Sequence, residues 1–271
     1  MQMQTAYETV LGTRRTDRPV ASDYIRHMIE GFHEMHGDRR AGDDPSVIAG
    51  VGRLCGMPVT VIGIEKGKDV RDKIRRNFGS AHPEGYRKAL RLMKQAEKFR
   101  RPVLCLVDTA GAFCGIDAEE HGAGQAIAES LAEMMALRTP ILSLIIGEGG
   151  SGGAIGLAAA NEVWMMEGAY YSVISPESCA NILWKDASRA ADAADSLKLT
   201  AKDLLSLGII EKILPENFPK TEELSNGVVP APFMRTLSQE LRARLEVLSS
   251  MDEEVLLDAR YEKFRRVGRD L

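Results

Sequence analysis

Short apolar segments recur along the chain and predict buried strands. They occupy residues 58–64, 103–107, 141–146, 163–166 and 171–174. Each is rich in β-branched or other apolar residues and lies next to Gly, Pro or Asp, as strands covered on both faces of a sheet usually do.

Amphipathic patterns with helical spacing lie between these segments. Residues 84–99 follow Pro83, a residue favoured in the first turn of a helix, and residues 119–137 repeat apolar side chains every three or four positions. Strands that alternate with helices predict an α/β fold with a largely parallel sheet.

Capping signals predict three further helices in the last third of the chain. They begin at Ser175 with Pro176, at Thr200 with Asp203, and at Ser250 with Glu253, the last before residues 255–264. Gly208 and Gly268 are predicted to end two of these helices, because glycine readily adopts the left-handed conformation that closes a helix.

The sequence divides into four predicted parts. Residues 1–22 form an N-terminal segment, residues 23–214 the main domain, residues 215–232 a linker, and residues 233–271 a closing pair of helices. The linker contains four prolines and few apolar pairs, which disfavours regular structure.

Composition indicates a protein that buries a full core. Its 271 residues are 44% hydrophobic and 27% charged, with a net charge of -4. Charges of both signs are interspersed, which argues against nucleic acid as a partner. The locally basic residues 66–76 form either a solvated face or a contact for a phosphate-bearing ligand. No stretch approaches the ~18 apolar residues of a membrane span, so we expect no membrane insertion.

Cysteine usage indicates a reducing compartment. The four cysteines are too widely spaced for a zinc ribbon and too few for a disulfide scaffold in a chain of this length. We therefore expect free thiols, no metal site and a cytoplasmic location. The first ten residues also lack the apolar core of a secretory signal.

Residues 147–156, Gly-Glu-Gly-Gly-Ser-Gly-Gly-Ala-Ile-Gly, are the most informative stretch for chemistry. They directly follow the apolar run 141–146, which predicts a buried strand, a glycine turn and a helix of small residues. Glycine allows a ligand to approach the backbone closely, and the N–H groups that open a helix attract an anion. The stretch is therefore equipped to hold an oxyanion or a phosphate.

Two catalytic motifs match this stretch poorly. Residues 149–153 fit the nucleophile pattern G-x-S-x-G around Ser151, but all five histidines precede Ser151, which excludes the chain order of an α/β-hydrolase. A Clp-type serine protease, with a different order, stays open. The glycines lack the lysine of a phosphate-binding P-loop and the acidic partner of a dinucleotide-binding motif.

The third interpretation is an oxyanion hole. The alternative is that the glycines only permit tight packing. A second glycine-containing turn, residues 108–115, follows the strand 103–107. Oxyanion holes commonly combine N–H groups from two segments, so Gly111 or Ala112 is predicted to face Gly152 or Gly153 across one pocket. Asp108, at the strand end, is either a catalytic carboxylate or, as is commoner, an acceptor of hydrogen bonds from its own turn, and we expect the latter.

Several motifs in order resemble one enzyme family. They are Arg-Arg-Asn-Phe-Gly at residues 75–79, Pro-Glu-Gly-Tyr-Arg-Lys-Ala-Leu-Arg-Leu-Met at 83–93, the glycine stretch 147–154, Ser-Val-Ile-Ser-Pro-Glu at 172–177 and Ile-Leu-Trp-Lys at 182–185. Together they resemble the carboxyltransferase α subunits of bacterial acetyl-CoA carboxylases, of the crotonase superfamily. The resemblance covers residues 23–215, with a looser match over the closing helices.

The resemblance implies a crotonase/Clp-type spiral of ββα units with flanking helices. It also implies an α2β2 heterotetramer with a zinc-containing carboxyltransferase β subunit, and an active site between unlike chains. The implied reaction transfers a carboxyl group from carboxybiotin, carried by the biotin carboxyl carrier protein, to acetyl-CoA. The product is malonyl-CoA, for fatty acid biosynthesis. Biotin carboxylase, a separate subunit, uses the ATP.

The resemblance also assigns roles to residues. Backbone N–H groups would stabilise enolates, with those of this chain on the biotin side and those of the β subunit on the acyl-CoA side. The implied catalytic residues are Gly152, Gly153, Gly111 and Ala112. The implied contacts to the biotin cofactor are Gly149, Gly150, Ser151 and Ala154, and Arg75 and Arg76, with Lys73 beside them, would contact phosphate or carboxylate.

One loop departs from the family pattern. The family usually reads Asp-Thr-Pro-Gly-Ala-Tyr-Pro-Gly, where this sequence has Ala110, Phe113 and Cys114 in place of both prolines and the tyrosine. A subunit for another acyl-CoA, such as propionyl-CoA, or a non-catalytic structural subunit therefore stays open. The sequence also lacks the four-cysteine zinc motif and the Ala-Met-Lys-Met biotinylation signature, so we expect neither bound zinc nor covalent biotin, and no activity without the β subunit.

Overall fold

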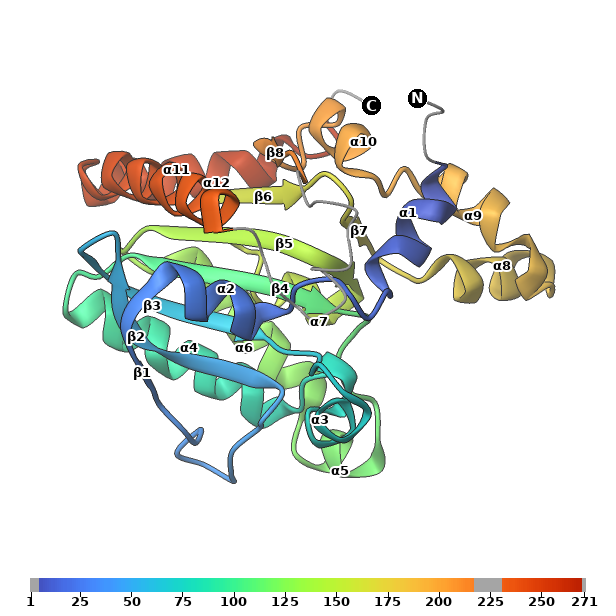
Figure 1. Cartoon of the computed structure of the whole chain (residues 1–271), viewed down its shortest axis with the longest axis horizontal. Helices are drawn as coiled ribbons and strands as arrows, with labels where there is room; N and C mark the ends of the chain where they lie inside the picture. The colour runs from blue at the N-terminus through green and yellow to red at the C-terminus, as the bar shows by residue number, and fades with distance from the viewer. Residues whose placement is uncertain (1–4, 217–230, 270–271) are drawn as a thin grey trace.

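The computed structural model describes residues 5–216 and 231–269, and these form an α/β structure around one mixed sheet (Figure 1). Eight strands make up this sheet in the order β1-β2-β3-β4-β5-β6-β8, with β7 paired to β5. They are β1 Ile29–Glu34, β2 Val47–Leu54, β3 Met57–Ile64, β4 Val103–Thr109, β5 Ile141–Gly150, β6 Glu162–Met166, β7 Tyr170–Ser172 and β8 Lys212–Leu214.

The helices lie around this sheet. They are α1 Ala6–Thr13, α2 Ala21–Met28, α3 Val70–Arg75, α4 Pro83–Lys98, α5 Ile116–Glu120, α6 Ala123–Ala136, α7 Ser151–Ile155, α8 Pro176–Trp184, α9 Ala190–Leu197, α10 Ala201–Ser206, α11 Ala231–Ser249 and α12 Glu253–Arg266, with 3₁₀ turns η1 Asn77–Gly79 and η2 Ala187–Arg189. In Figure 1, α1, α8 and α9 lie beyond the right-hand ends of β4 and β5, and α11 and α12 lie along the upper side of the sheet.

The predicted α/β class and the largely parallel sheet are confirmed. β1, β2 and β3 form an antiparallel meander, whereas β3, β4, β5, β6 and β8 pair in parallel, as do β5 and β7. All residues of β4 and β5 are buried, which explains why their sequences are mostly apolar. The five predicted strands correspond to β3 to β7.

The strand before the glycines is longer than predicted. β5 continues through Gly150, because Gly149 stays in register with Thr109 of β4 and with Tyr171 of β7. Residues 147–150 are therefore strand, and the prediction of a glycine turn there is wrong. The chain turns at Ser151, whose φ of 50° is unusual for a residue with a side chain.

Two other helix predictions need correction. Residues 119–137 are not one helix, because Gly122 adopts a left-handed φ of 77° and separates α5 from α6. Ser250 does not cap the last helix: Asp252 does, by accepting a hydrogen bond from the Glu254 N–H. The other predicted helix signals are confirmed, namely the caps Ser175 and Thr200, and Gly208 and Gly268, which have positive φ just beyond the helix ends.

Sequence reasoning missed β1, β2 and β8. Two glycines inside β2 weaken its strand pattern. Both are required because β1 approaches closely: a Cβ on Gly50 would lie 2.3 Å from the His33 carbonyl oxygen, and one on Gly52 would lie 2.4 Å from the Ile29 side chain. β1 is largely exposed and β8 has only three residues, so neither shows a strong apolar pattern.

The two closing helices pack onto the main body. Leu237, Leu241 and Leu245 of α11 belong to the same apolar core as the strands. Residues 217–230, most of the predicted linker, lie outside the described residues, so the division of the chain into four parts stays a prediction. None of the helices within the described residues is both long and apolar enough to cross a membrane.

Candidate functional site

The structure brings the two predicted glycine segments into direct contact at the carboxyl ends of β4 and β5. A Cβ on Gly153 would lie 2.6 Å from the amide nitrogen of Ala112 and 2.7 Å from the carbonyl carbon of Gly111. Only a glycine at position 153 allows this approach. The segment after β4 and the helix after β5 therefore form one backbone surface.

Glycines of β5 also allow close approach to β4, to the loop after it and to β7. A Cβ on Gly150 would lie 2.1 Å from the Ala110 carbonyl oxygen, and one on Gly147 would lie 2.4 Å from Asp108 Oδ1. Gly149 likewise faces the Tyr170 carbonyl oxygen, which would lie 2.8 Å from a Cβ at this position. Gly147, Gly149, Gly150 and Gly153 thus each allow a close approach that a side chain would block.

Backbone donors are available on this surface. Ser151, Gly152 and Gly153 open α7, so their N–H groups have no carbonyl within the helix to bond. The Gly111 N–H is already engaged, since it donates to Thr109 Oγ1 at 3.1 Å. Of the two predicted donors in this loop, Ala112 is therefore the one left to bind a ligand.

Space remains next to these donors. Among residues 5–216 and 231–269, a Cβ on Gly111 would meet nothing within 4 Å, and one on Gly152 would meet only Ile127 Cδ1 at 3.6 Å. Ser151 is exposed and Gly152 is half-buried. The backbone at the start of α7 is thus open on the side that a ligand would approach.

Ser151 lacks the partners of a protease nucleophile. Among the described residues, no histidine forms a hydrogen bond with Ser151. His82 instead stacks on Phe113 with ring centroids 4.3 Å apart, and His121 Nδ1 lies 2.7 Å from Glu84 Oε1. The constellation of a Clp-type serine protease is not formed.

Arg75 and Arg76 interact within their own part of the chain. Both hydrogen-bond to Asp72 Oδ1, from Nη2 of Arg75 at 2.7 Å and from Nε of Arg76 at 3.0 Å. Arg76 also donates to the Pro45 carbonyl oxygen at 2.7 Å. Their predicted contact with a phosphate or carboxylate of the ligand stays a prediction.

A buried charge cluster lies beneath the glycine surface, and sequence reasoning did not find it. Lys66, just after β3, places Nζ 2.7 Å from Asp108 Oδ1 and 2.5 Å from Glu148 Oε2. Asp108 Oδ1 also accepts the Glu148 N–H at 2.8 Å. The expectation that Asp108 bonds its own turn is therefore wrong: it joins its strand to β5 and to the segment after β3. Lys66 is likewise no part of a solvated basic face.

The cluster continues toward the N-terminal helix. Arg14 donates to Glu148 Oε1 at 3.1 Å and pairs with Glu177 at 2.5 Å, and Tyr170 donates to Glu148 Oε1 at 3.0 Å. Burial alone would raise the pKa of Glu148, but Lys66 and Arg14 outweigh it and hold the pKa below its usual value. Glu148 is thus held as a carboxylate.

The residues that depart from the family pattern lie in the loop between β4 and α5. Phe113 packs on His82, and Gly115 is needed there because a Cβ would lie 2.4 Å from the Phe113 ring. Cys114 is exposed. All four cysteines are free thiols.

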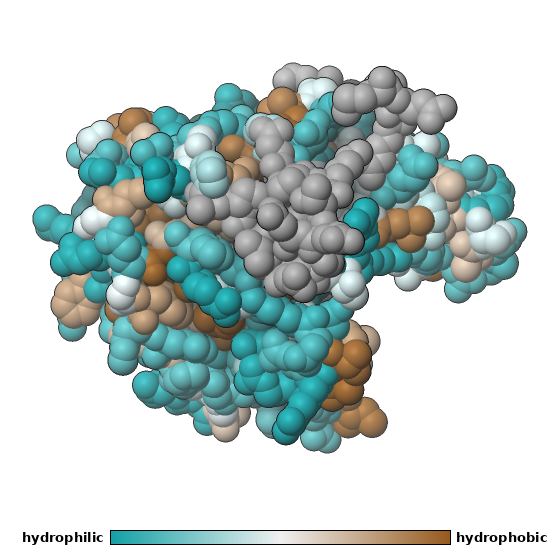
Figure 2. Space-filling view, in the orientation of Figure 1, coloured by the Kyte–Doolittle hydropathy of each residue, from teal (hydrophilic) through white to brown (hydrophobic). Residues whose placement is uncertain are grey.

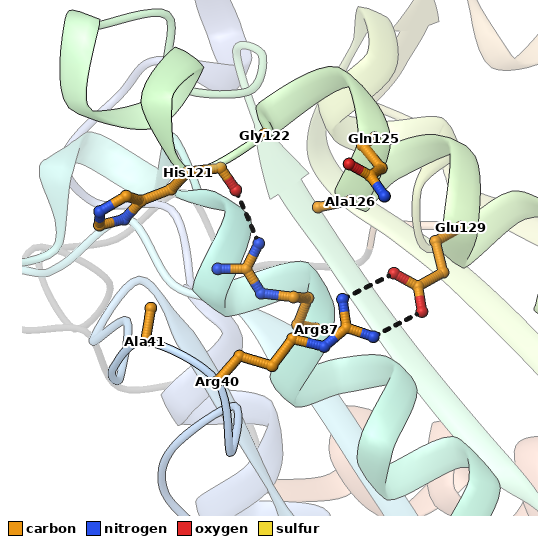
Figure 3. Close-up of a pocket in the computed structure, with 8 residues that line it drawn as sticks. All are labelled: Arg40, Ala41, Arg87, His121, Gly122, Gln125, Ala126 and Glu129. Carbon is orange, nitrogen blue, oxygen red and sulfur yellow. Dashed lines mark hydrogen bonds and ion pairs between the residues drawn. The ribbon is translucent and has the colours of Figure 1, made fainter.

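A separate polar pocket of about 280 Å³ lies between α4, α6 and the loop before β2 (Figure 3). Its arginines already have partners: Arg40 makes two hydrogen bonds to Glu129, and Arg87 donates to the His121 carbonyl oxygen. Arg87 also pairs with Asp38 and Glu84, so this family-motif arginine ties the 38–44 loop to α4. None of the predicted site residues lines this pocket.

Solved structures with this fold include a transcarboxylase and a malonate decarboxylase. Transcarboxylase 12S, solved with methylmalonyl-coenzyme A and methylmalonic acid bound, superposes with a TM-score of 0.64 at 16% identity, over 84% of this chain and 42% of that one. A Pseudomonas malonate decarboxylase hetero-tetramer in complex with coenzyme A gives 0.65 at 19%, over 85% and 93%. The protein thus has the crotonase-type fold in the form found in carboxyltransferases, as predicted.

Sequence relatives identify the family. The family model described as acetyl co-enzyme A carboxylase carboxyltransferase-like matches residues 1–268. The acetyl-coenzyme A carboxylase carboxyl transferase subunit alpha of Ruminiclostridium cellulolyticum is 52% identical over 97% of this chain and 98% of that relative. A Natranaerobius thermophilus protein named as the fused subunits beta/alpha is 51% identical over 98% of this chain and 43% of its own length. The chain belongs to the acetyl co-enzyme A carboxylase carboxyltransferase-like family.

Proposed function

We propose that this chain is the α subunit of an acetyl-CoA carboxylase carboxyltransferase. It would transfer a carboxyl group from carboxybiotin, held on a biotin carboxyl carrier protein, to acetyl-CoA to give malonyl-CoA, the committed step of fatty acid biosynthesis. The observation that carries the proposal is the contact of Gly153 with the Gly111–Ala112 peptide. That contact sets donors from two segments side by side, in a family whose relatives bear this name.

The reaction requires hydrogen-bond donors that stabilise a developing negative charge. The N–H groups of Gly152 and Gly153, together with that of Ala112, are the groups we assign to this task, and Gly149, Gly150, Ser151 and Ala154 shape the surface around them. Loss of one such donor costs on the order of 3 kcal/mol in comparable sites. Because these are backbone groups, no ionisable side chain needs to titrate for them to act.

The open backbone beside Gly111 and Gly152 fits the carboxybiotin group. No side chain in the part of the chain that the structure describes lies within 4 Å of the position of a Gly111 Cβ, which leaves room for a flat ring to approach the amides. When bound, carboxybiotin supplies the carboxyl group that is transferred. The chain's own residues would bind its oxygen and orient it, and Arg75 and Arg76 would contact a phosphate or carboxylate.

A β subunit would complete the site, in an α2β2 heterotetramer. The relative named subunits beta/alpha joins both names in one chain, which supports a close partnership. Exposed apolar side chains flank the loop after β4, namely Val70, Ile74, Phe78 and Ile116. Figure 2 shows apolar surface at the lower right of the molecule, where α3 and α5 lie in Figure 1. We further expect biotin carboxylase as a partner and a cytoplasmic location.

The test is the reverse reaction, with malonyl-CoA and free biotin as substrates and acetyl-CoA as the measured product. We expect no turnover with this chain alone or with a purified β subunit alone, and turnover when the two are mixed. Propionyl-CoA as the forward substrate, compared with acetyl-CoA, distinguishes the alternative acyl-CoA. A stable complex without turnover on either would favour a structural subunit and contradict the proposal.

A further inference from the structure

Lys66 connects the two strands that lead into the glycine surface. Its Nζ lies 2.7 Å from Asp108, near the end of β4, and 2.5 Å from Glu148, near the end of β5. Asp108 and Glu148 are also joined directly, through the Glu148 N–H and Asp108 Oδ1 at 2.8 Å. One ammonium group thus holds the ends of β4 and β5 to the segment after β3.

Little chain separates these carboxylates from the proposed donors. Asp108 precedes Ala112 by four residues, and Glu148 precedes Gly152 by four. Those residues have no freedom to absorb a shift, because Gly150 lies against the Ala110 carbonyl and Gly147 lies against the Asp108 carboxylate. A change in the separation of Asp108 and Glu148 would therefore reach the donors themselves.

The electrostatics of the cluster depend on Lys66. The side chains of Asp108 and Glu148 are only 3% and 7% exposed. Burial, together with the nearby Glu148 charge, raises the pKa of Asp108, and the Lys66 ammonium group opposes this shift. Arg14 contacts Glu148 but not Asp108. Within residues 5–216 and 231–269, Lys66 is the cation that forms an ion pair with Asp108.

Other charged and titratable groups surround the cluster on every side. They are Arg14 of α1, Arg18 before α2, Tyr24 of α2, Tyr170 of β7 and, behind Arg14, Glu177 of α8. Burial by itself would lower the pKa of Lys66, and the charges of Asp108 and Glu148 outweigh it, so the pKa lies above its usual value. Lys66 therefore stays an ammonium ion at neutral pH.

We propose that Lys66 is a positioning residue for carboxyl transfer: by neutralising Asp108 and Glu148 together, it sets the spacing between the loop after β4 and the start of α7. The inference rests on the proposed function. Lys66 acts through the two carboxylates rather than on substrate, since its side chain is only 14% exposed and its ammonium group is already bonded to both. Its contribution is one of charge, so it depends on the ionisation of its partners.

The first test uses the variant Lys66→Met assembled with the β subunit. This substitution removes the positive charge of the side chain and keeps a similar length. At about pH 8 Asp108 has no cation beside it and repels the Glu148 carboxylate, which keeps only Arg14 as a partner. We expect kcat to fall about tenfold or more, with KM for malonyl-CoA changed less than about twofold. At about pH 6 the pair takes up a proton, the repulsion ends, and the deficit relative to wild type shrinks.

The double variant Lys66→Met/Asp108→Asn separates charge from packing. The Asp108→Asn substitution retains an oxygen to accept the Glu148 N–H but removes the charge, so the repulsion is absent. We expect kcat of the double variant at about pH 8 to recover to within about threefold of wild type, with no pH-dependent deficit. The double variant does not bury two carboxylates without Lys66 between them. It therefore still tests the role of charge if Lys66→Met alone fails to fold.

A measurement without turnover separates this inference from the proposed function. Amide hydrogen exchange, followed by mass spectrometry, should be faster in peptides covering residues 109–115 and 147–156 of Lys66→Met, and near wild type in the double variant. Lys263→Met is the matched control: Lys263 is also buried and paired, with Glu211 at 2.8 Å, but lies in α12. In this control, exchange in the two peptides and kcat should be unchanged.

The outcomes decide between the two ideas. An inactive wild-type complex contradicts the proposed function alone, and the exchange data still decide the role of Lys66. Unchanged exchange in Lys66→Met, with kcat near wild type, overturns the inference. So does a loss that is equal at both pH values and not relieved by Asp108→Asn, since that pattern indicates lost packing rather than unbalanced charge.

Discussion

Gly153 and Ala112 touch through their backbones, although they lie on separate segments of the sequence: a Cβ on Gly153 would come within 2.6 Å of the Ala112 amide nitrogen. The contact joins the loop that follows β4 to the helix that follows β5. Any side chain at position 153 must push the two segments apart. The proposed donors on both segments would then lose their mutual geometry.

The docking of α12 depends on Arg260, which is fully buried. It donates to the carbonyl oxygens of Met134, Leu137 and Thr139 and to Asn161 Oδ1. Arg260→Met removes a donor from the three carbonyl oxygens, whereas Asn161 Oδ1 keeps the Ile141 N–H. We expect the free energy of unfolding to fall by about 1–3 kcal/mol.

Urea denaturation followed by circular dichroism measures this loss. Arg265→Met, at an exposed position of the same helix, is the control and should change stability by less than about 0.5 kcal/mol. Equal effects of the two substitutions would mean that the bonds of Arg260 do not hold α12 in place.

Thiol reactivity should report the exposure of the loop after β4. Cys114 is exposed, Cys55 is half-buried, and Cys105 and Cys179 are buried. We expect a maleimide to label Cys114 first in the native protein and the buried pair only after unfolding. An adduct on Cys114, three residues from Gly111, should lower kcat of the assembled enzyme, and Cys114→Ser should protect against this loss. Labelling of Cys105 at the rate of Cys114 would be the contrary result.

Burial raises the pKa of the Cys105 thiol to about 12. In the unfolded chain this thiol ionises near pH ~8.5–9. The unfolded state therefore loses its proton first as pH rises, and the destabilising effect is absent below about pH 8 and grows as pH rises toward 12. Between about pH 8 and pH 10, wild type should lose roughly 1.4 kcal/mol more stability than Cys105→Ala.

Denaturant unfolding under reducing conditions at both pH values tests this difference. The interval from about pH 6 to pH 7 is the internal control, because the thiol is protonated in both states there and the two proteins should change in parallel. Parallel behaviour up to about pH 10 would show that Cys105 ionises readily in the folded protein.

Local sequence patterns were sufficient for the parallel strands and for both glycine segments. Continuous apolar runs such as β4 and β5 occur where both faces are buried, and a glycine-rich stretch directly after such a run indicates close backbone packing. Gly50 and Gly52 show the limit of this reasoning: the same residue type that marked the site in β5 concealed the strand β2, because the β1 contact that requires glycine there is not visible in the sequence.

The charge cluster could not be read from the sequence for a different reason. Lys66 and Glu148 are 82 residues apart, and no local pattern pairs them. Only the convergence of β3, β4 and β5 at one edge removes them from water and brings them together. Glu148 stands between Gly147 and Gly149, and a lone carboxylate inside a buried glycine stretch is the signal that could have indicated a partner.

The most direct test of the account is the rate of the reverse reaction in Gly153→Ala assembled with the β subunit. Gly124→Ala is the matched control, since a Cβ at this helical glycine meets nothing within 4 Å and should add stability of about 0.5–1 kcal/mol. We expect Gly153→Ala to lower kcat about 100-fold while the complex still assembles, and Gly124→Ala to leave kcat unchanged. Wild-type kcat in an assembled Gly153→Ala complex would contradict a shared site built from these two backbone segments.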